Sequence, residues 1–326
     1  MAALIDPMAA GPAIVDIRDF SGHELDPLLL EETVEWQREL DWDFGRSADL
    51  VHQFADMRAL MGVVLVDRGE VAGYGYSVLE EHKGLVGDVY VRPRWRDGIN
   101  EVRVFRAILD GLIATPTVAR VESQLMLLDP AAGRALQRER FVKTQERMLM
   151  TLDATNADRF TIGPASHRFH IMPWAEHYHE AAAEVIALAY VGHVDSQIND
   201  QYRTTNGARR FIYNIVQFPG CGSFFRQGSF VALHPGTGRM MGISLVSFVS
   251  EQVGHVTQLC VTPNAKGSGL GYELLRESVN ALRMHGARRI SLTVTCANDE
   301  AIRLYGRCGF KDVRRFLSNV WERSKD

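Results

Sequence analysis

The stretch Lys266-Gly267-Ser268-Gly269-Leu270-Gly271 follows an apolar strand pattern that ends at Val261, and it leads directly into a helix pattern. A glycine-rich turn at this place leaves several backbone N–H groups without partners and directs them to one point, where the helix dipole adds positive potential. Glycine also reaches positive φ and lets a ligand approach the backbone. The stretch therefore predicts an anion site that fits a pyrophosphate. A helix start that binds nothing would look similar, so the loop alone does not assign a function.

A second pattern follows the loop after one strand. Ile290, Leu292 and Val294 alternate with polar residues, which is typical of a half-buried strand. The next helix is expected to begin at Asn298 and carries the pattern N-x-x-A-x-x-L-Y-x-x-x-G-F. Its defined positions are Asn298, Ala301, Leu304, Tyr305, Gly309 and Phe310.

The two elements, with a strand between them, resemble the GNAT superfamily of acyl-coenzyme A-dependent N-acyltransferases. The resemblance implies acetyl-CoA as cofactor, with its pyrophosphate on Lys266, Gly267, Ser268, Gly269, Leu270 and Gly271. It implies that the preceding strand parts from its neighbour, so that the pantetheine arm pairs with the backbone of Leu259, Cys260 and Val261. Asn298 would touch the pantetheine, and Tyr305 would lie near the thioester sulfur. Dinucleotide-binding folds also use glycine loops, but the acidic residue they need about 20 residues on is not in a strand pattern here.

The candidate catalytic residues are Tyr305 and His255. Tyr305 would donate a proton to the departing thiolate, although it would equally pack in the core. Many members of the family have a carboxylate base on the strand before the loop, and His255 occupies the matching place six residues before Val261. Imidazole is a reasonable base near neutral pH, but a structural role for His255 or a water-relayed base such as Glu251 stays open. Cys260 is interpreted as a small buried strand residue.

Residues 189–211 are expected to shape the acceptor pocket, because the family places helices there after its first strand. Asp195 and Tyr202 are the candidate substrate residues in this segment. Asp195 would attract a cationic amine, or it would cap a helix. Asn298 would serve as a helix N-cap whether or not it binds a ligand. Lys266 would bind the pyrophosphate, or it would be only a solvated surface charge.

The chain contains an internal duplication. When Val91 is laid on Val261, strands and helices follow in the same order, and 129–141 corresponds to 298–310 with one residue of slippage. A period of over a hundred residues indicates duplicated domains. The expected fold is α+β, with two tandem GNAT-like domains that each have a mostly antiparallel central sheet flanked by helices. The expected ranges are a tail at 1–13, a degenerate domain at 14–152, a linker at 153–167 and a catalytic domain at 168–326.

The first copy has lost the chemistry-bearing residues. Under the Val91 and Val261 alignment, Arg96 matches Lys266, and the three loop glycines become Asp97, Ile99 and Glu101, which leaves Gly98 near the turn. In the second motif, Asp129, Leu136 and Arg140 replace Asn298, Tyr305 and Gly309. We therefore expect one coenzyme A per chain, bound by the second domain.

Composition limits the remaining possibilities. The 326 residues exceed one usual core, and 46% hydrophobic with 23% charged residues indicates a globular chain. A formal charge of -4 disfavours nucleic acid as a partner. The four cysteines lack metal-ligand spacing, no metal is expected, and neither a signal peptide nor a membrane span is recognised, so a cytoplasmic protein is expected.

The predicted function is transfer of an acetyl group from acetyl-CoA to a primary amine of a small molecule or peptide, by direct attack on the thioester. The alternative is a non-catalytic acyl-CoA sensor that binds a protein partner, against which the retained Tyr305 argues. A reaction with aminoacyl-tRNA would require a basic groove, which the acidic composition disfavours.

Overall fold

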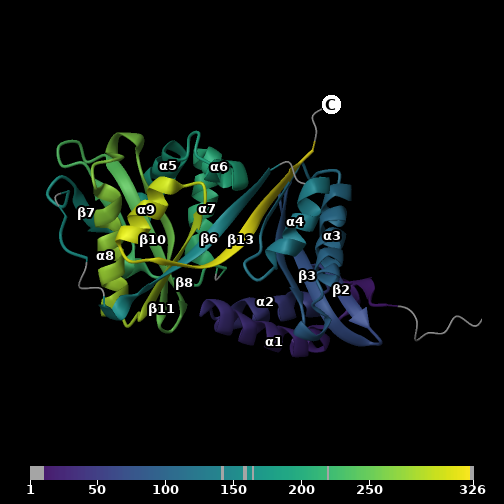
Figure 1. Ribbon diagram of the computed structural model, residues 1–326. Coiled ribbons are helices and arrows are strands. Elements are labelled where there is room, and N and C mark those ends of the chain that lie inside the picture. Colours follow the sequence, from purple (N-terminus) through teal and green to yellow (C-terminus); the bar gives the residue numbers. More distant parts are fainter. Residues whose placement is uncertain (1–10, 141–142, 157–159, 164, 219, 324–326) are drawn as a thin grey trace, which may run out of the picture. The chain divides into compact units, whose positions relative to one another are not determined.

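The computed structural model describes residues 11–323 except 141–142, 157–159, 164 and 219, and it divides into two compact units (Figure 1). Unit 1 comprises Met1–Leu40, Phe44–Gln145 and Phe316–Asp326. Unit 2 comprises Asp41–Asp43 and Glu146–Arg315. Each unit holds a mostly antiparallel sheet flanked by helices, which confirms the predicted α+β fold with two tandem domains.

The sheet of unit 1 has the strand order β1-β2-β3-β4-β5-β13, in which only β4 and β5 are parallel. Helix α3 packs on one face, where Phe105 and Ile108 share a buried core cluster with Val89. Helices α1 and α2 cover the other face, onto which Tyr90 points. Its elements are β1 (Ala13–Asp16), α1 (Gly22–Leu40), α2 (Gly45–Asp56), β2 (Met61–Asp67), β3 (Glu70–Glu80), β4 (Lys83–Val91), α3 (Ile99–Ala114), β5 (Arg120–Gln124), α4 (Pro130–Arg140) and β13 (Lys311–Glu322).

The sheet of unit 2 has the order β6-β12-β11-β10-β9-β7, and β8 pairs with β10. Successive residues of β10 point to opposite faces: Leu245 packs with α5 and α7, whereas Val246 packs with α8 and α9. Its elements are β6 (Lys143–Asp153), β7 (His170–Pro173), α5 (His179–Ala189), α6 (Asp195–Ile198), α7 (Thr205–Gln217), β8 (Ser223–Phe224), β9 (Phe230–Leu233), β10 (Met240–Ser250), β11 (Val253–Val261), α8 (Leu270–Met284), β12 (Arg289–Thr295) and α9 (Asp299–Arg307).

The two copies exchange their last strands. Strand β6, which ends the first copy in the sequence, pairs with β12 of unit 2 from Thr295↔Arg147 to Arg289↔Asp153. Strand β13, which ends the second copy, pairs with β5 of unit 1 from Ser318↔Gln124 to Glu322↔Arg120 (Figure 1). The compact units therefore differ from the predicted ranges at both strands.

The segment expected to be a linker packs on unit 2. Phe160 and Ala154 are buried in the core under α8, and Phe160 stacks on Tyr272 with ring centroids 6.3 Å apart. The Tyr272 hydroxyl donates to the carbonyl oxygen of Thr161 at 2.7 Å. The described part of this segment is thus a structural element of the second copy. In the ranges given above, no helix has both the length and the apolar composition needed to cross a bilayer.

Candidate functional site

Strands β11 and β12 part within the sheet of unit 2. Their parallel pairing runs only from Val253↔Arg289 to Val256↔Leu292, whereas β11 stays paired with β10 up to Val261. Beyond Leu292, β12 continues and pairs with β6 on its other side. The segment with Leu259, Cys260 and Val261 therefore has an edge toward β12 that is open to an added strand. Along this strand, Leu259 faces the α8 side and Cys260 faces the α5 side.

The glycine loop joins the open end of β11 to α8. Gly267 and Gly269 have φ values of +72° and +90°, a region that favours glycine. In the described chain, the backbone N–H groups of Gly267, Gly269 and Gly271 have no acceptor, and Gly271 lies in the first turn of α8. A Cβ on Gly267 would meet nothing within 4 Å, and one on Gly271 would meet only the tip of Leu304 at 3.9 Å. The loop is thus an open cradle of N–H groups that fits a pyrophosphate.

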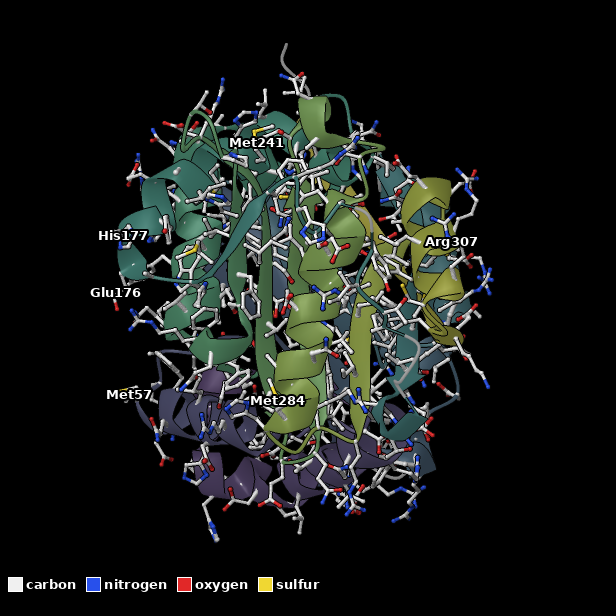
Figure 2. The ribbon with its side chains drawn as sticks, turned by 90° about the vertical axis from the view of Figure 1, so that its left-hand side faces the viewer. Met57, Glu176, His177, Met241, Met284 and Arg307 are labelled. Carbon is white, nitrogen blue, oxygen red and sulfur yellow. The ribbon has the colours of Figure 1, made fainter. Side chains whose placement is uncertain are left out.

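The other loop residues divide between solvent and core. Lys266 is exposed, whereas Leu270 is fully buried under the sheet and offers only its backbone. The Ser268 hydroxyl donates to the carbonyl oxygen of Ala265 at 2.6 Å and accepts from Leu270 N at 3.3 Å. Figure 2 shows the face of the sheet that α8 covers. The helix ends at Met284, and the glycine loop at its other end lies toward Met241. The carbonyl oxygen of Met241 accepts a hydrogen bond from Thr262 N.

Asn298 and Tyr305 lie on α9, on the α8 side of the sheet. The Asn298 side chain accepts from Ala301 N at 3.2 Å, which confirms its N-cap role. Its amide nitrogen lies 3.2 Å from His193 Nε2. Tyr305 is 8% exposed and packs against Phe310. Burial, reinforced by Asp195, raises the pKa of Tyr305 above its ordinary value, so the phenol stays protonated and is able to donate.

The α5 side of the opening carries a polar network. Gln258 on β11 donates through Nε2 to the Tyr190 hydroxyl at 3.0 Å, and Tyr190 stacks on Tyr202 with centroids 4.3 Å apart. Asp195 does not cap α6; its buried carboxylate accepts from the Thr295 hydroxyl of β12 instead. Asp195 and Tyr202, both predicted, thus lie beside the opening together with Gln258, Tyr190 and Thr295.

His193 connects the two sides. Its Nδ1 accepts from Asp195 N at 3.1 Å and lies 3.8 Å from the Asp195 carboxylate, while Nε2 faces Asn298. Its side chain is 21% exposed. The sequence analysis assigned no role to His193, Gln258 or Thr295. A polar residue directly before Leu259 in an apolar strand was the available signal for Gln258, whereas His193 gave none beyond its place in the acceptor segment.

His255 lies on the paired part of β11 and is 4% exposed. Its Nδ1 lies 2.8 Å from the Ser291 hydroxyl, and its ring tilts against Trp42 at 5.0 Å. Burial, with the positive charge of Arg147, lowers the pKa of His255 to about 3. These contacts favour the structural role that the sequence left open. The alternative base, Glu251, is exposed in the turn before β11, roughly 30 Å from the glycine loop along the strand.

Cys260 remains a thiol in this environment. Burial raises its pKa to about 12, even though Gln258 and the charge of Lys266 act in the opposite direction. A neutral thiol is a poor nucleophile, so a covalent acetyl-cysteine is disfavoured.

The corresponding place in unit 1 is filled by its own side chains. Asp97 accepts from Ile99 N at 3.0 Å and Asn100 N at 2.8 Å, and Glu101 accepts from Gly98 N at 3.1 Å. The loop is also one residue shorter: Gly98, with a φ of +76°, precedes α3 as Gly269 precedes α8. The predicted match of Gly269 with Ile99 is therefore wrong by one position. The side chains of Leu136 and Arg140 lie outside the described set, and Asp129 accepts from Ala131 N at 2.6 Å.

The comparisons with known proteins agree with this geometry. Residues 196–310 match the model of the Acetyltransferase (GNAT) family. A segment of 87 residues is 32% identical to a mycothiol acetyltransferase from Actinosynnema mirum; it covers 27% of this chain and 29% of that protein's length.

Two solved structures resemble nearly the whole chain. A GCN5-related N-acetyltransferase from Sphaerobacter thermophilus has 18% identity and a TM-score of 0.64, and the match covers 95% of each chain. A tandem GNAT protein from the clavulanic acid biosynthesis pathway, solved without AcCoA, has 16% identity and a TM-score of 0.60 over 97% of this chain and all of that one. These likenesses show the tandem fold, and the family match identifies residues 196–310 as a GNAT acetyltransferase domain of the acyltransferase class.

Proposed function

We propose that unit 2 of this GNAT protein transfers an acetyl group from acetyl-CoA to a primary amine of a small molecule or peptide. The observation that carries the proposal is the strand edge of β11, open from Leu259 to Val261, which ends at a loop of unpaired N–H groups. An extended pantetheine arm requires an open strand edge, and a pyrophosphate requires a cradle of unpaired N–H groups. Acetyl-CoA, when bound, supplies an acetyl group activated as a thioester.

Gly267, Gly269 and Gly271 would hold the pyrophosphate through their N–H groups, with Lys266 adding positive charge at the exposed rim. The backbone of Leu259, Cys260 and Val261 would pair with the pantetheine arm, and Asn298 would fix its far end. Tyr305, protonated in its buried position, would donate to the departing sulfur.

The incoming amine must lose a proton, because alkyl amines are charged near neutral pH. His193 is the better placed acceptor, since it is partly exposed and lies against Asn298, whereas His255 is buried and its pKa of about 3 makes it a weak base. The Asp195 carboxylate lies 3.8 Å from His193 Nδ1.

The test is a screen of primary amines with acetyl-CoA, in which release of free thiol is followed. Turnover with an amine, and acetylation of that amine shown by mass spectrometry, would support the proposal. Tight binding of acetyl-CoA without turnover for any amine or peptide would favour the acyl-CoA sensor instead.

A further inference from the structure

Arg147 lies on the acceptor side of the sheet of unit 2, although it comes from the strand that ends the first copy. It stands opposite Thr295 in the antiparallel pair of β6 and β12, and directly opposite residues point to the same face. Its Nη2 donates to the Thr293 hydroxyl at 3.3 Å, which places the guanidinium on that face. Since Thr295 bonds Asp195 of α6, this is the face that carries α6.

This face is polar across three neighbouring strands. The Ser247 and Thr257 hydroxyls lie 3.3 Å apart, and His255 contacts Ser291. Sheet faces covered by helices are normally apolar, as β10 is where Ile243 and Leu245 meet α5 and α7. Ser247, Ser291 and His255 are buried and paired with polar neighbours, so this face is polar from β10 to β12, and Arg147 on β6 continues the polar strip.

The electrostatic influence of Arg147 is centred on this strip. Burial raises the pKa of Tyr202, and the charge of Arg147 is the strongest opposing effect. Burial likewise raises the pKa of Cys221 to about 11, again opposed by Arg147. Arg147 has the weakest of the effects that act on Tyr305. The positive charge of Arg147 therefore acts on residues of the acceptor segment as well as on Tyr305.

Arg147 and Asp195 lie on either side of Thr295, one opposite it in the sheet and the other bonded to its hydroxyl. This arrangement presents one cation and one anion to the same ligand. A molecule that carries both an amine and a carboxylate has the complementary charges, and a guanidinium binds a carboxylate through two parallel hydrogen bonds.

We propose that Arg147 binds a carboxylate of the acceptor, so that the substrate class is amino acids and other amines that carry a carboxylate. The inference rests on the proposed function and narrows it. In this proposal Arg147 selects the acceptor through its carboxylate, and Asp195 attracts the ammonium group of the same molecule.

The test uses pairs of amines that differ by one carboxylate: phenylalanine with phenethylamine, lysine with cadaverine, and glutamate with 4-aminobutyrate. A fourth pair, phosphoethanolamine with ethanolamine, tests phosphate as the anion. We expect kcat/KM to favour the member with the additional carboxylate by about 10- to 100-fold, the value of a charged hydrogen bond. Arg147→Met should bring the ratio of kcat/KM values close to one. Arg147→Lys should give a ratio between one and the wild-type value, since lysine keeps the positive charge but lacks the two parallel N–H donors of the guanidinium.

The matched control is Arg239→Met, which removes an exposed arginine between β9 and β10 and should keep the full preference. Acetylation without a carboxylate preference, or a preference that survives in Arg147→Met, would overturn the inference. A phosphate preference that disappears in Arg147→Met would overturn the carboxylate assignment. Calorimetric titration of the same pairs in the presence of coenzyme A judges the inference even if no amine is acetylated, an outcome that would count against the proposed function alone.

Discussion

The N-termini of α3 and α8 have the same backbone design and opposite uses. Each helix follows a strand, a short turn and a glycine in the left-handed region. At α3 the N–H groups of Gly98, Ile99 and Asn100 are bonded by Asp97 and Glu101. At α8, Leu270 N donates to the Ser268 hydroxyl, whereas the N–H groups of Gly269 and Gly271 have no acceptor in the described chain. The duplicated copy thus satisfied its helix terminus internally and gained a cap, while the other copy left the terminus free for a ligand.

The acceptor sides differ in the same way. Gln258 on β11 and Asp88 on β4 both lie three residues before the end of their strand. Gln258 bonds a tyrosine beside the open edge, whereas Asp88 is buried against Glu32. Burial raises the pKa of Glu32, so it keeps its proton and donates to Asp88. In unit 1 the carboxylates satisfy one another, and the space is used for packing.

The first prediction concerns the unpaired N–H groups at the N-terminus of α8, and its expected effect on coenzyme A affinity is the largest. Gly271→Glu should reduce coenzyme A affinity by at least about 100-fold, because its carboxylate would occupy and repel the pyrophosphate. The wild-type chain should titrate calorimetrically with one equivalent of coenzyme A. Gly269→Glu is a poorer test, since the φ of +90° would strain any side chain there.

Gly111→Glu in α3 is the matched control, because a Cβ at Gly111 meets nothing within 4 Å and one at Gly271 meets only Leu304 at 3.9 Å. It should leave one equivalent and the wild-type affinity. Two equivalents of coenzyme A per wild-type chain would contradict the proposed difference between the copies. Unchanged coenzyme A affinity in a folded Gly271→Glu variant would mean that the loop only begins a helix and binds no pyrophosphate.

The second prediction concerns His193. His193→Gln should lower kcat by about 10²- to 10⁴-fold, the usual contribution of a general base, with little change in coenzyme A affinity. Steady-state kinetics and calorimetry separate the two effects. A wild-type kcat would leave proton removal to solvent or to another group.

The third prediction concerns Tyr305, which the first copy lacks. Tyr305→Phe keeps the ring that packs on Phe310 and removes only the donor, so kcat should fall by about 10- to 10⁴-fold at unchanged cofactor affinity. If turnover is unaffected, Tyr305 is a core residue only.

The sequence predicted what local signals encode. The end of β11 at Val261, the alternating pattern of β12 and the cap at Asn298 depend on residues within one turn or strand. The exchange of β6 and β13 was missed because strand pairing between distant segments leaves no local pattern. Arg147, His193 and Asn298 are far apart in the chain, so only the fold brings them to one opening. The low pKa of His255 likewise follows from burial, which residue type does not reveal.

A smaller effect is expected from Asp97, the residue that closes the terminus of α3. Asp97→Ala removes the acceptor of two backbone N–H groups and should lower the free energy of unfolding by about 1 kcal/mol, which urea denaturation measures. Asp97→Asn keeps an acceptor and should cost less. Coenzyme A stoichiometry should stay at one, because Glu101 still bonds Gly98 N; a second equivalent would mean that Asp97 alone had blocked the site.

The smallest effect on catalysis is expected from His255→Gln, which retains a polar group facing Ser291. Since the pKa of His255 is about 3, its imidazole is uncharged from pH 5 to 8, and the pH profile of kcat should match that of the wild type. Stability should respond instead. The lowered pKa means that the folded state disfavours protonated His255, so the wild-type chain loses stability as pH falls from about 6.5 toward 3, and the variant should lose less. Urea midpoints between pH 4 and 8 measure this difference. If the acidic limb of kcat disappears in His255→Gln while the same limb persists in His193→Gln, the assignment is reversed and His255 is the base, as the strand position first indicated.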